Sequence, residues 1–173
     1  MIEALSALCV FVSLGGLVLA AGYDLATFTI PNRVVAMVGL ANTLAMVLAV
    51  PDISTAAQYI ATGLVVLLVG AVLFALRMWG AGDAKLLAAV SLAVGSKGLI
   101  VLGLWTALSG GGLALIFLVL RRLPMLGKTR LGQWYLPTLL ANNGVPYGVA
   151  IAAGGIIAFA SHATLLRIGI PGR

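Results

Sequence analysis

The sequence predicts an all-α, polytopic membrane protein with about six transmembrane helices, and two observations support this prediction. Of the 173 residues, 62% are hydrophobic and only 8% are charged, whereas a soluble domain carries roughly a quarter charged residues. The apolar residues form runs along the whole chain, which leaves no room for a separate soluble domain. Helices are expected because isolated strands cannot span lipid and the alternation typical of a barrel is absent. We therefore expect residues 1–173 to form one transmembrane domain.

Turn signals divide the apolar sequence into six expected helices. Asp24 and a short piece ending near Pro31 follow the first run, and a proline here favours the restart of a helix. The sequence around Asp52 has an N-cap pattern, and glycine-rich breaks occur at residues 80–83 and 95–98. The expected helices cover residues 4–23, 34–50, 59–76, 84–94, 99–120 and 145–166.

Three features of these helices need comment. The fourth, residues 84–94, is shorter than the roughly 20 residues that a span needs, and it reaches membrane length only if it begins near Gly80. The fifth contains three consecutive glycines at 110–112, which in a membrane allow a close approach of helices or a kink. Cys9, the single cysteine, permits no internal disulfide and no Cys-based zinc site, so we expect it to pack or to contact lipid.

The ten basic residues, which give a formal net charge of +6, lie in the short connections. There they serve as orientation signals and contacts to lipid headgroups, so we expect membrane lipids and no nucleic acid as partners. The first run lacks a basic n-region and is expected to stay as a helix rather than be cleaved as a signal peptide. With the N-terminus outside, seven basic residues lie inside and three outside, as the positive-inside rule requires. The inside group is Arg33, Arg77, Lys85, Arg121, Arg122, Lys128 and Arg130, and the outside group is Lys97, Arg167 and Arg173.

This orientation places two of the four acidic residues, Asp24 and Asp83, at the same cytoplasmic side. Asp24 ends a helix, where the negative end of the helix dipole disfavours a carboxylate. The alternative to a functional role is an ion pair with Arg33. Asp83 could be an ordinary N-cap, but Gly80 and Gly82 before it allow a backbone or an extended substrate to approach closely.

Two carboxyl groups held together can perform the chemistry of aspartic proteases, in which one deprotonates a water and the other donates to a carbonyl oxygen. No other hydrolytic set is available, because His162 lies far from both acids in the predicted topology. We expect neither a metal nor a cofactor. Lys85 is most simply an anchor to headgroups, with tuning of the field at Asp83 as its functional alternative. A non-enzymatic alternative is a transporter or assembly subunit that uses the two aspartates as proton or cation sites.

Three sequence elements, in this order, resemble the type IV prepilin peptidases, which are intramembrane aspartic proteases of the GxGD kind. They are Asp24 followed by Ile30-Pro31-Asn32, then Gly80-Ala81-Gly82-Asp83-Ala84-Lys85-Leu86, then Val145-Pro146-Tyr147-Gly148-Val149-Ala150-Ile151. The short length and the third element are most similar to the small branch that serves Flp/Tad pili. Larger members carry a cysteine-rich cytoplasmic insert. This chain has no such cysteines, so we expect a peptidase without the insert.

The resemblance implies that Asp24 and Asp83 are the catalytic pair of an endopeptidase. It also implies a prepilin substrate, in which a short basic leader precedes an apolar helix, cut at the cytoplasmic face of the bacterial inner membrane. The residues of the three elements that are expected to bind the substrate or shape the site are Gly80, Gly82, Lys85, Pro31, Asn32, Pro146, Tyr147 and Gly148.

Overall fold

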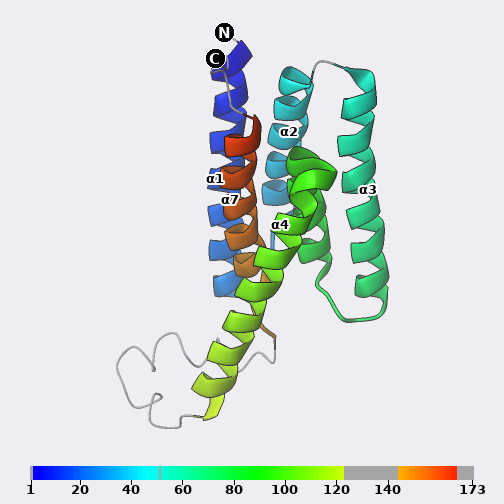
Figure 1. The fold of residues 1–173 in the computed structure, drawn as a ribbon. Helices are drawn as coiled ribbons and strands as arrows, with labels where there is room; N and C mark the ends of the chain where they lie inside the picture. The colour runs from blue at the N-terminus through cyan, green and yellow to red at the C-terminus, as the bar shows by residue number, and fades with distance from the viewer. Residues whose placement is uncertain (1, 51, 123–143, 167–173) are drawn as a thin grey trace.

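The computed structural model of the protein describes residues 2–50, 52–122 and 144–166, and its regular elements within these ranges are all α-helices. The all-α fold class is therefore confirmed. Figure 1 shows the helices packed against one another as a bundle. Their bounds are α1 (Ile2–Thr27), α2 (Asn32–Ala49), α3 (Ile53–Ala75), α4 (Ala81–Arg122) and α7 (Tyr147–Leu166).

Four of these helices are long and apolar enough to cross a membrane, namely α1, α2, α3 and α4. The apolar part of α7, Tyr147–Ser161, is shorter. Large apolar side chains of α3 such as Leu64 and Leu68 are exposed, and such a surface suits lipid rather than water. The chain is therefore a membrane protein. The expectation of about six spans stays a prediction.

The longest helix, α4, is interrupted at Gly95, which has φ 58° and ψ −168°. Only glycine adopts such a backbone readily. A Cβ at this position would also lie 3.1 Å from the ring of Tyr59. The turn predicted at residues 95–98 is confirmed at its first glycine: α4 consists of two helical parts that meet at Gly95, and the chain reverses its direction there (Figure 1).

The part of α4 after the kink packs antiparallel to α7. Thr106 contacts Gly154 near the middle of α7, whereas Gly110, further along α4, contacts Tyr147 at the beginning of α7. Figure 1 shows this part of α4 running back along α7. A Cβ at Gly110 would lie 2.8 Å from the Tyr147 ring, so the glycine triplet allows a close approach of helices, and the kink lies elsewhere.

The connection between α1 and α2 is a tight turn. Phe28 follows the last residue of α1 with a left-handed φ of 52°, and its N–H donates to the carbonyl of Asp24 at 2.8 Å. The chain then passes through Ile30, which is buried, to Pro31. Pro31 is the N-cap of α2, and its carbonyl accepts the N–H of Val34 at 3.0 Å. The predicted helix restart at this proline is confirmed.

The N-cap predicted at Asp52 is confirmed as well. Its Oδ1 accepts the Thr55 N–H at 2.7 Å and the Ser54 hydroxyl at 2.6 Å. These bonds satisfy donors that the first turn of a helix leaves free. Because the cap sits at residue 52, α3 begins at Ile53, earlier than the predicted residue 59.

The core lies between α1, α2, α7 and the first part of α4. Leu17, Val38, Leu86, Val90 and Ile151, which come from these four helices, are completely buried. The helix α3 contributes less and buries mainly small residues against α4. The four core helices therefore fix the positions of the groups at the end of the bundle where α1 ends and where α2, α4 and α7 begin.

Candidate active site

Asp24 is buried at the end of α1, with 5% of its surface exposed. Its Oδ2 accepts the backbone N–H of Gly148 at 2.6 Å. Gly148 is the second residue of α7, so its N–H belongs to the four that a helix leaves without an internal partner. The positive end of the α7 dipole thus faces a carboxylate that the dipole of its own helix disfavours.

The alternative explanation of Asp24, an ion pair with Arg33, is not what the structure has. Within the described part of the chain, the hydrogen bond to the Asp24 carboxylate comes from Gly148, and no ion pair joins Asp24 to Arg33. The contact with Gly148 is tight on both sides. A Cβ at that position would lie 2.9 Å from Asp24 Oδ2 and 2.9 Å from Cδ1 of Ile30. Only a glycine fits between these groups.

Asp83 is half-buried in the first turn of α4. The carbonyl of Gly80 accepts the N–H of Ala84 at 3.2 Å, which makes Gly80 the N-cap and places Asp83 inside the helix. The interpretation of Asp83 as an ordinary N-cap is therefore wrong. Its carboxylate turns back toward Gly80 and accepts the backbone N–H of that residue. A Cβ at Gly80 would lie 2.7 Å from Asp83 Oδ2.

The fold brings Asp24, in the last turn of α1, and Asp83, in the first turn of α4, to the same end of the bundle. Ile30 lies between the segments that hold them. Its Cδ1 packs against Gly148, and its Cβ would lie 3.1 Å from a Cβ at Gly82. The turn after α1, the beginning of α4 and the beginning of α7 thus meet around this one side chain, and the two glycines allow them to approach.

An aromatic pair stands beside the same two segments. Trp79 precedes Gly80, and Tyr147 precedes Gly148. Their ring centroids are 6.4 Å apart and the planes are tilted by 56°, which is a favourable arrangement for aromatic rings. The pair therefore links the stretch before α4 to the beginning of α7, next to both acids.

Lys85 and Asn32 contact each other rather than either acid. Lys85 Nζ donates to Asn32 Oδ1 at 3.1 Å, which connects α4 to the first residue of α2. Both side chains are exposed. Pro146, which precedes α7, is completely buried, and its carbonyl accepts the Val149 N–H at 3.3 Å. These residues brace the helix beginnings around the two acids.

Other residues singled out from the sequence lie elsewhere. Cys9 is buried near the other end of α1. His162 belongs to α7, but its side chain falls outside the described residues, as does most of the basic stretch expected at residues 121–135. In the described ranges no three His, Cys, Asp or Glu side chains gather in a way that could hold a metal ion.

Ile30 and Trp79 are the two residues near the site that the sequence did not single out as site residues. Ile30 stands in the element of residues 30–32, but an isoleucine in an apolar chain carries no chemical signal of its own. Trp79 looks like an interfacial anchor at the end of an apolar run. Only the fold reveals that Ile30 contacts Gly82, next to Asp83, and that Trp79 contacts Tyr147, next to the Gly148 that binds Asp24.

The arrangement has the parts that peptide hydrolysis by two carboxyl groups requires. A buried carboxylate fixed by a backbone donor lies at the same end of the bundle as a second, half-buried one that another helix supplies. Such a pair can activate a water and protonate a carbonyl oxygen without a cofactor. Beside it, Gly80 is exposed and Gly82, in the first turn of α4, is partly exposed.

Residues 11–115 match the model of the type IV leader peptidase family. The matched range contains both Asp24 and Asp83 and ends before α7. No curated protein and no solved structure matches the chain.

Proposed function

Because the chain belongs to the type IV leader peptidase family, we propose that it is an intramembrane aspartic endopeptidase that removes the leader from prepilin precursors. The observation that carries this proposal is that Asp24 and Asp83 lie at the same end of the bundle, on segments that meet around Ile30. Placing two ionisable groups near membrane depth costs free energy. A shared function explains why both occur at one end of the bundle.

In the proposed reaction, one of the two carboxylates takes a proton from a water molecule, which attacks the carbon of the scissile peptide bond. The other carboxyl group donates a proton to the carbonyl oxygen. When the tetrahedral intermediate collapses, the nitrogen of the mature protein leaves with a proton from the first carboxyl group. The hydrogen bond from Gly148 fixes the orientation of the Asp24 carboxylate for these steps. Holding a catalytic group in the reactive geometry lowers the barrier of the reaction substantially.

The proposed substrate is an apolar helix preceded by a short basic leader, as the resemblance to the small Flp/Tad branch implies. The proposed location is the bacterial inner membrane, with the N-terminus outside and the site at the cytoplasmic side. The distribution of basic residues supports this orientation, because Arg33, Arg77 and Lys85 all lie near the helix ends that surround the two acids. The membership in a peptidase family supports cleavage over the alternative of proton or cation transport.

A cleavage assay tests the proposal. The purified protein, reconstituted in lipid vesicles, is mixed with a precursor that carries a basic leader and an apolar helix. Asp24→Asn and Asp83→Asn should each lower the rate of cleavage by about 10³-fold or more. Asp52→Asn is the matched control, since Asp52 caps α3, and it should cleave normally. Cleavage at the normal rate by either Asp24→Asn or Asp83→Asn would refute the paired mechanism.

A further inference from the structure

An apolar groove of about 640 Å³ lies on the outer surface between α1 and α2. Nine of the ten residues that line it are apolar, and the tenth is Arg33. Its rims carry exposed side chains such as Leu8 and Leu40, and its floor contains the small buried side chains of Cys9 and Ala41. In a bilayer such a trough holds no water, so an apolar group from the surroundings has to fill it.

The size of the groove suits a flexible chain rather than a helix. A transmembrane helix of 20 residues, treated as a cylinder about 30 Å long and 10 Å wide, occupies roughly 2,400 Å³. The groove has about a quarter of that volume. It lies within the range of pockets that take small-molecule ligands.

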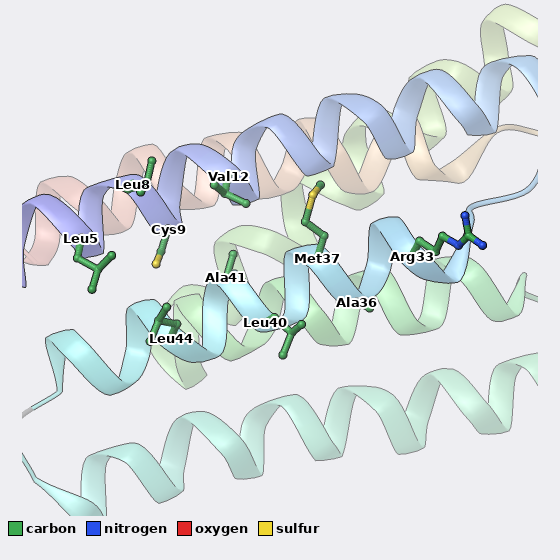
Figure 2. Close-up of a pocket in the computed structure, with 10 residues that line it drawn as sticks. All are labelled: Leu5, Leu8, Cys9, Val12, Arg33, Ala36, Met37, Leu40, Ala41 and Leu44. Carbon is green, nitrogen blue, oxygen red and sulfur yellow. The ribbon is translucent and has the colours of Figure 1, made fainter.

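The length of the groove matches one leaflet of a bilayer. Figure 2 shows Leu5 and Leu44 at one end and Arg33 at the other. Arg33 and Leu44 are eleven residues apart on α2 (44 minus 33), which corresponds to about 16 Å along the helix. Half of the hydrocarbon core of a bilayer is about 15 Å. Arg33, at the second residue of α2, therefore lies where a leaflet has its headgroups.

Arg33 is exposed, and among the described residues it forms no ion pair. A guanidinium at the end of an apolar groove is suited to bind phosphate, which it can contact with two parallel hydrogen bonds. We propose that the groove is a binding site for one phospholipid of the membrane, with an acyl chain between α1 and α2 and the phosphate on Arg33. The site is separate from the proposed catalytic pair.

Native mass spectrometry of the purified protein in detergent tests the headgroup contact. The probes are dioleoyl phosphatidylglycerol and dioleoylglycerol, which share their chains and differ in the phosphate. Arg33→Gln should lower the retention of phosphatidylglycerol by roughly fivefold and leave that of dioleoylglycerol unchanged. Arg122→Gln, at the exposed end of α4, is the matched control and should retain both. Equal losses in the two variants would overturn the proposal.

Photo-crosslinking of the unmodified protein tests the groove itself. Phosphatidylglycerol with a photoreactive group on one acyl chain, in vesicles of phosphatidylcholine, should label residues 5–12 and 36–44 at least fivefold more than the exposed face of α3. Ala41→Phe, which fills the floor, should remove this preference, whereas Leu68→Phe on the exposed face of α3 should keep it. Uniform labelling of all lipid-facing helices, or crosslinks from the groove to a second copy of the chain or to a precursor helix, would contradict the proposed occupant.

Discussion

Asp24 takes its hydrogen bond from Gly148, 124 positions further along the chain, whereas Asp83 takes its hydrogen bond from Gly80, three residues before it. Asp24 lies at the unfavourable end of its helix, and the amide at the beginning of α7 compensates for this. Asp83 lies in the first turn of α4, where the dipole favours a carboxylate. The orientation of the Asp24 carboxylate therefore depends on the packing of α7 against α1, whereas residues close in sequence orient the Asp83 carboxylate.

The packing is also tighter around Asp24 than around Asp83. At Gly148 an added methyl group would meet the Asp24 carboxylate and the Ile30 side chain together. At Gly80 it would meet only the Asp83 carboxylate, which is the free end of a side chain. We expect the Asp24 half of the site to be intolerant of substitution and the Asp83 half to adjust.

The largest effect predicted from this comparison is that of Gly148→Ala. The new methyl group would displace Asp24 and break the 2.6 Å bond that orients it. A displacement of about 1 Å in a catalytic group costs on the order of 10²-fold in rate. The cleavage rate of the precursor in vesicles measures this loss.

The matched control for this variant is Gly111→Ala, since no atom lies within 4 Å of a Cβ at Gly111. It should cleave at the normal rate and unfold at the same temperature or slightly higher, because alanine favours a helix. A Gly148→Ala protein that is inserted and as active as Gly111→Ala would show that the bond to Asp24 has no role in cleavage.

A smaller effect is expected for Gly80→Ala. The methyl group would push the Asp83 carboxylate away from the Gly80 N–H, but the side chain can rotate and keep its place near Asp24. We predict a loss of roughly tenfold in the cleavage rate, well below that of Gly148→Ala. If Gly80→Ala lowers the cleavage rate more than Gly148→Ala does, the surroundings of Asp24 are not the more rigid of the two.

The stretch that leads to Asp83 contains a strained residue whose relief should leave cleavage unchanged. Arg77 has a left-handed φ of 58°, and its N–H donates to Phe74 O while Met78 N–H donates to Leu73 O, both at 2.9 Å. This is a Schellman motif with arginine where glycine is preferred. Arg77→Gly should stabilise the protein by about 1 kcal/mol relative to Arg77→Ala, which removes the same charge.

Thermal unfolding in detergent measures the difference between these two variants, and the cleavage assay checks that both remain active. If Arg77→Gly is no more stable than Arg77→Ala, the left-handed backbone at this position carries no cost. A lower cleavage rate in Arg77→Gly alone would show that the strain itself helps to place Asp83.

The smallest effect concerns Asp52, an acid with a purely structural role. The Ser54 hydroxyl and the Thr55 N–H hold the pKa of its carboxyl group at about 2. The ionised cap therefore stabilises the beginning of α3 fully above about pH 4, the ordinary range of an aspartate, and this contribution is lost as the pH falls toward 2. The protection of the first turn of α3 against hydrogen exchange, corrected for the intrinsic rate at each pH, should fall over that window in the natural protein.

In Asp52→Ala this protection should be low at every pH, because the cap is absent. The cleavage rate at neutral pH should stay normal, in contrast to variants of the two acids of the site. A pH profile that is the same in Asp52→Ala and in the natural protein would mean that another group controls the beginning of α3.

The sequence predicted the helical membrane fold and the two acids because these depend on local signals. Low charge, apolar runs, the cap at Asp52 and the proline at position 31 act within a few residues. The turn at Gly95 was also predicted from its local glycines, and the non-helical backbone there confirms it. The hydrogen bond from Gly148 to Asp24 joins residues of separate helices. Ile30 likewise packs against Gly82 and Gly148, which belong to two other helices. No local sequence pattern encodes such contacts.

The separation of the Asp24 and Asp83 carboxyl groups, measured in an experimentally determined structure of the protein in lipid, tests the central claim most directly. If the two acids form one site, both carboxyl groups lie within hydrogen-bond distance of one water molecule, with their nearest oxygens no more than about 6 Å apart. A separation of roughly 10 Å or more, with Asp24 paired to Arg33 rather than bonded to Gly148, would contradict it.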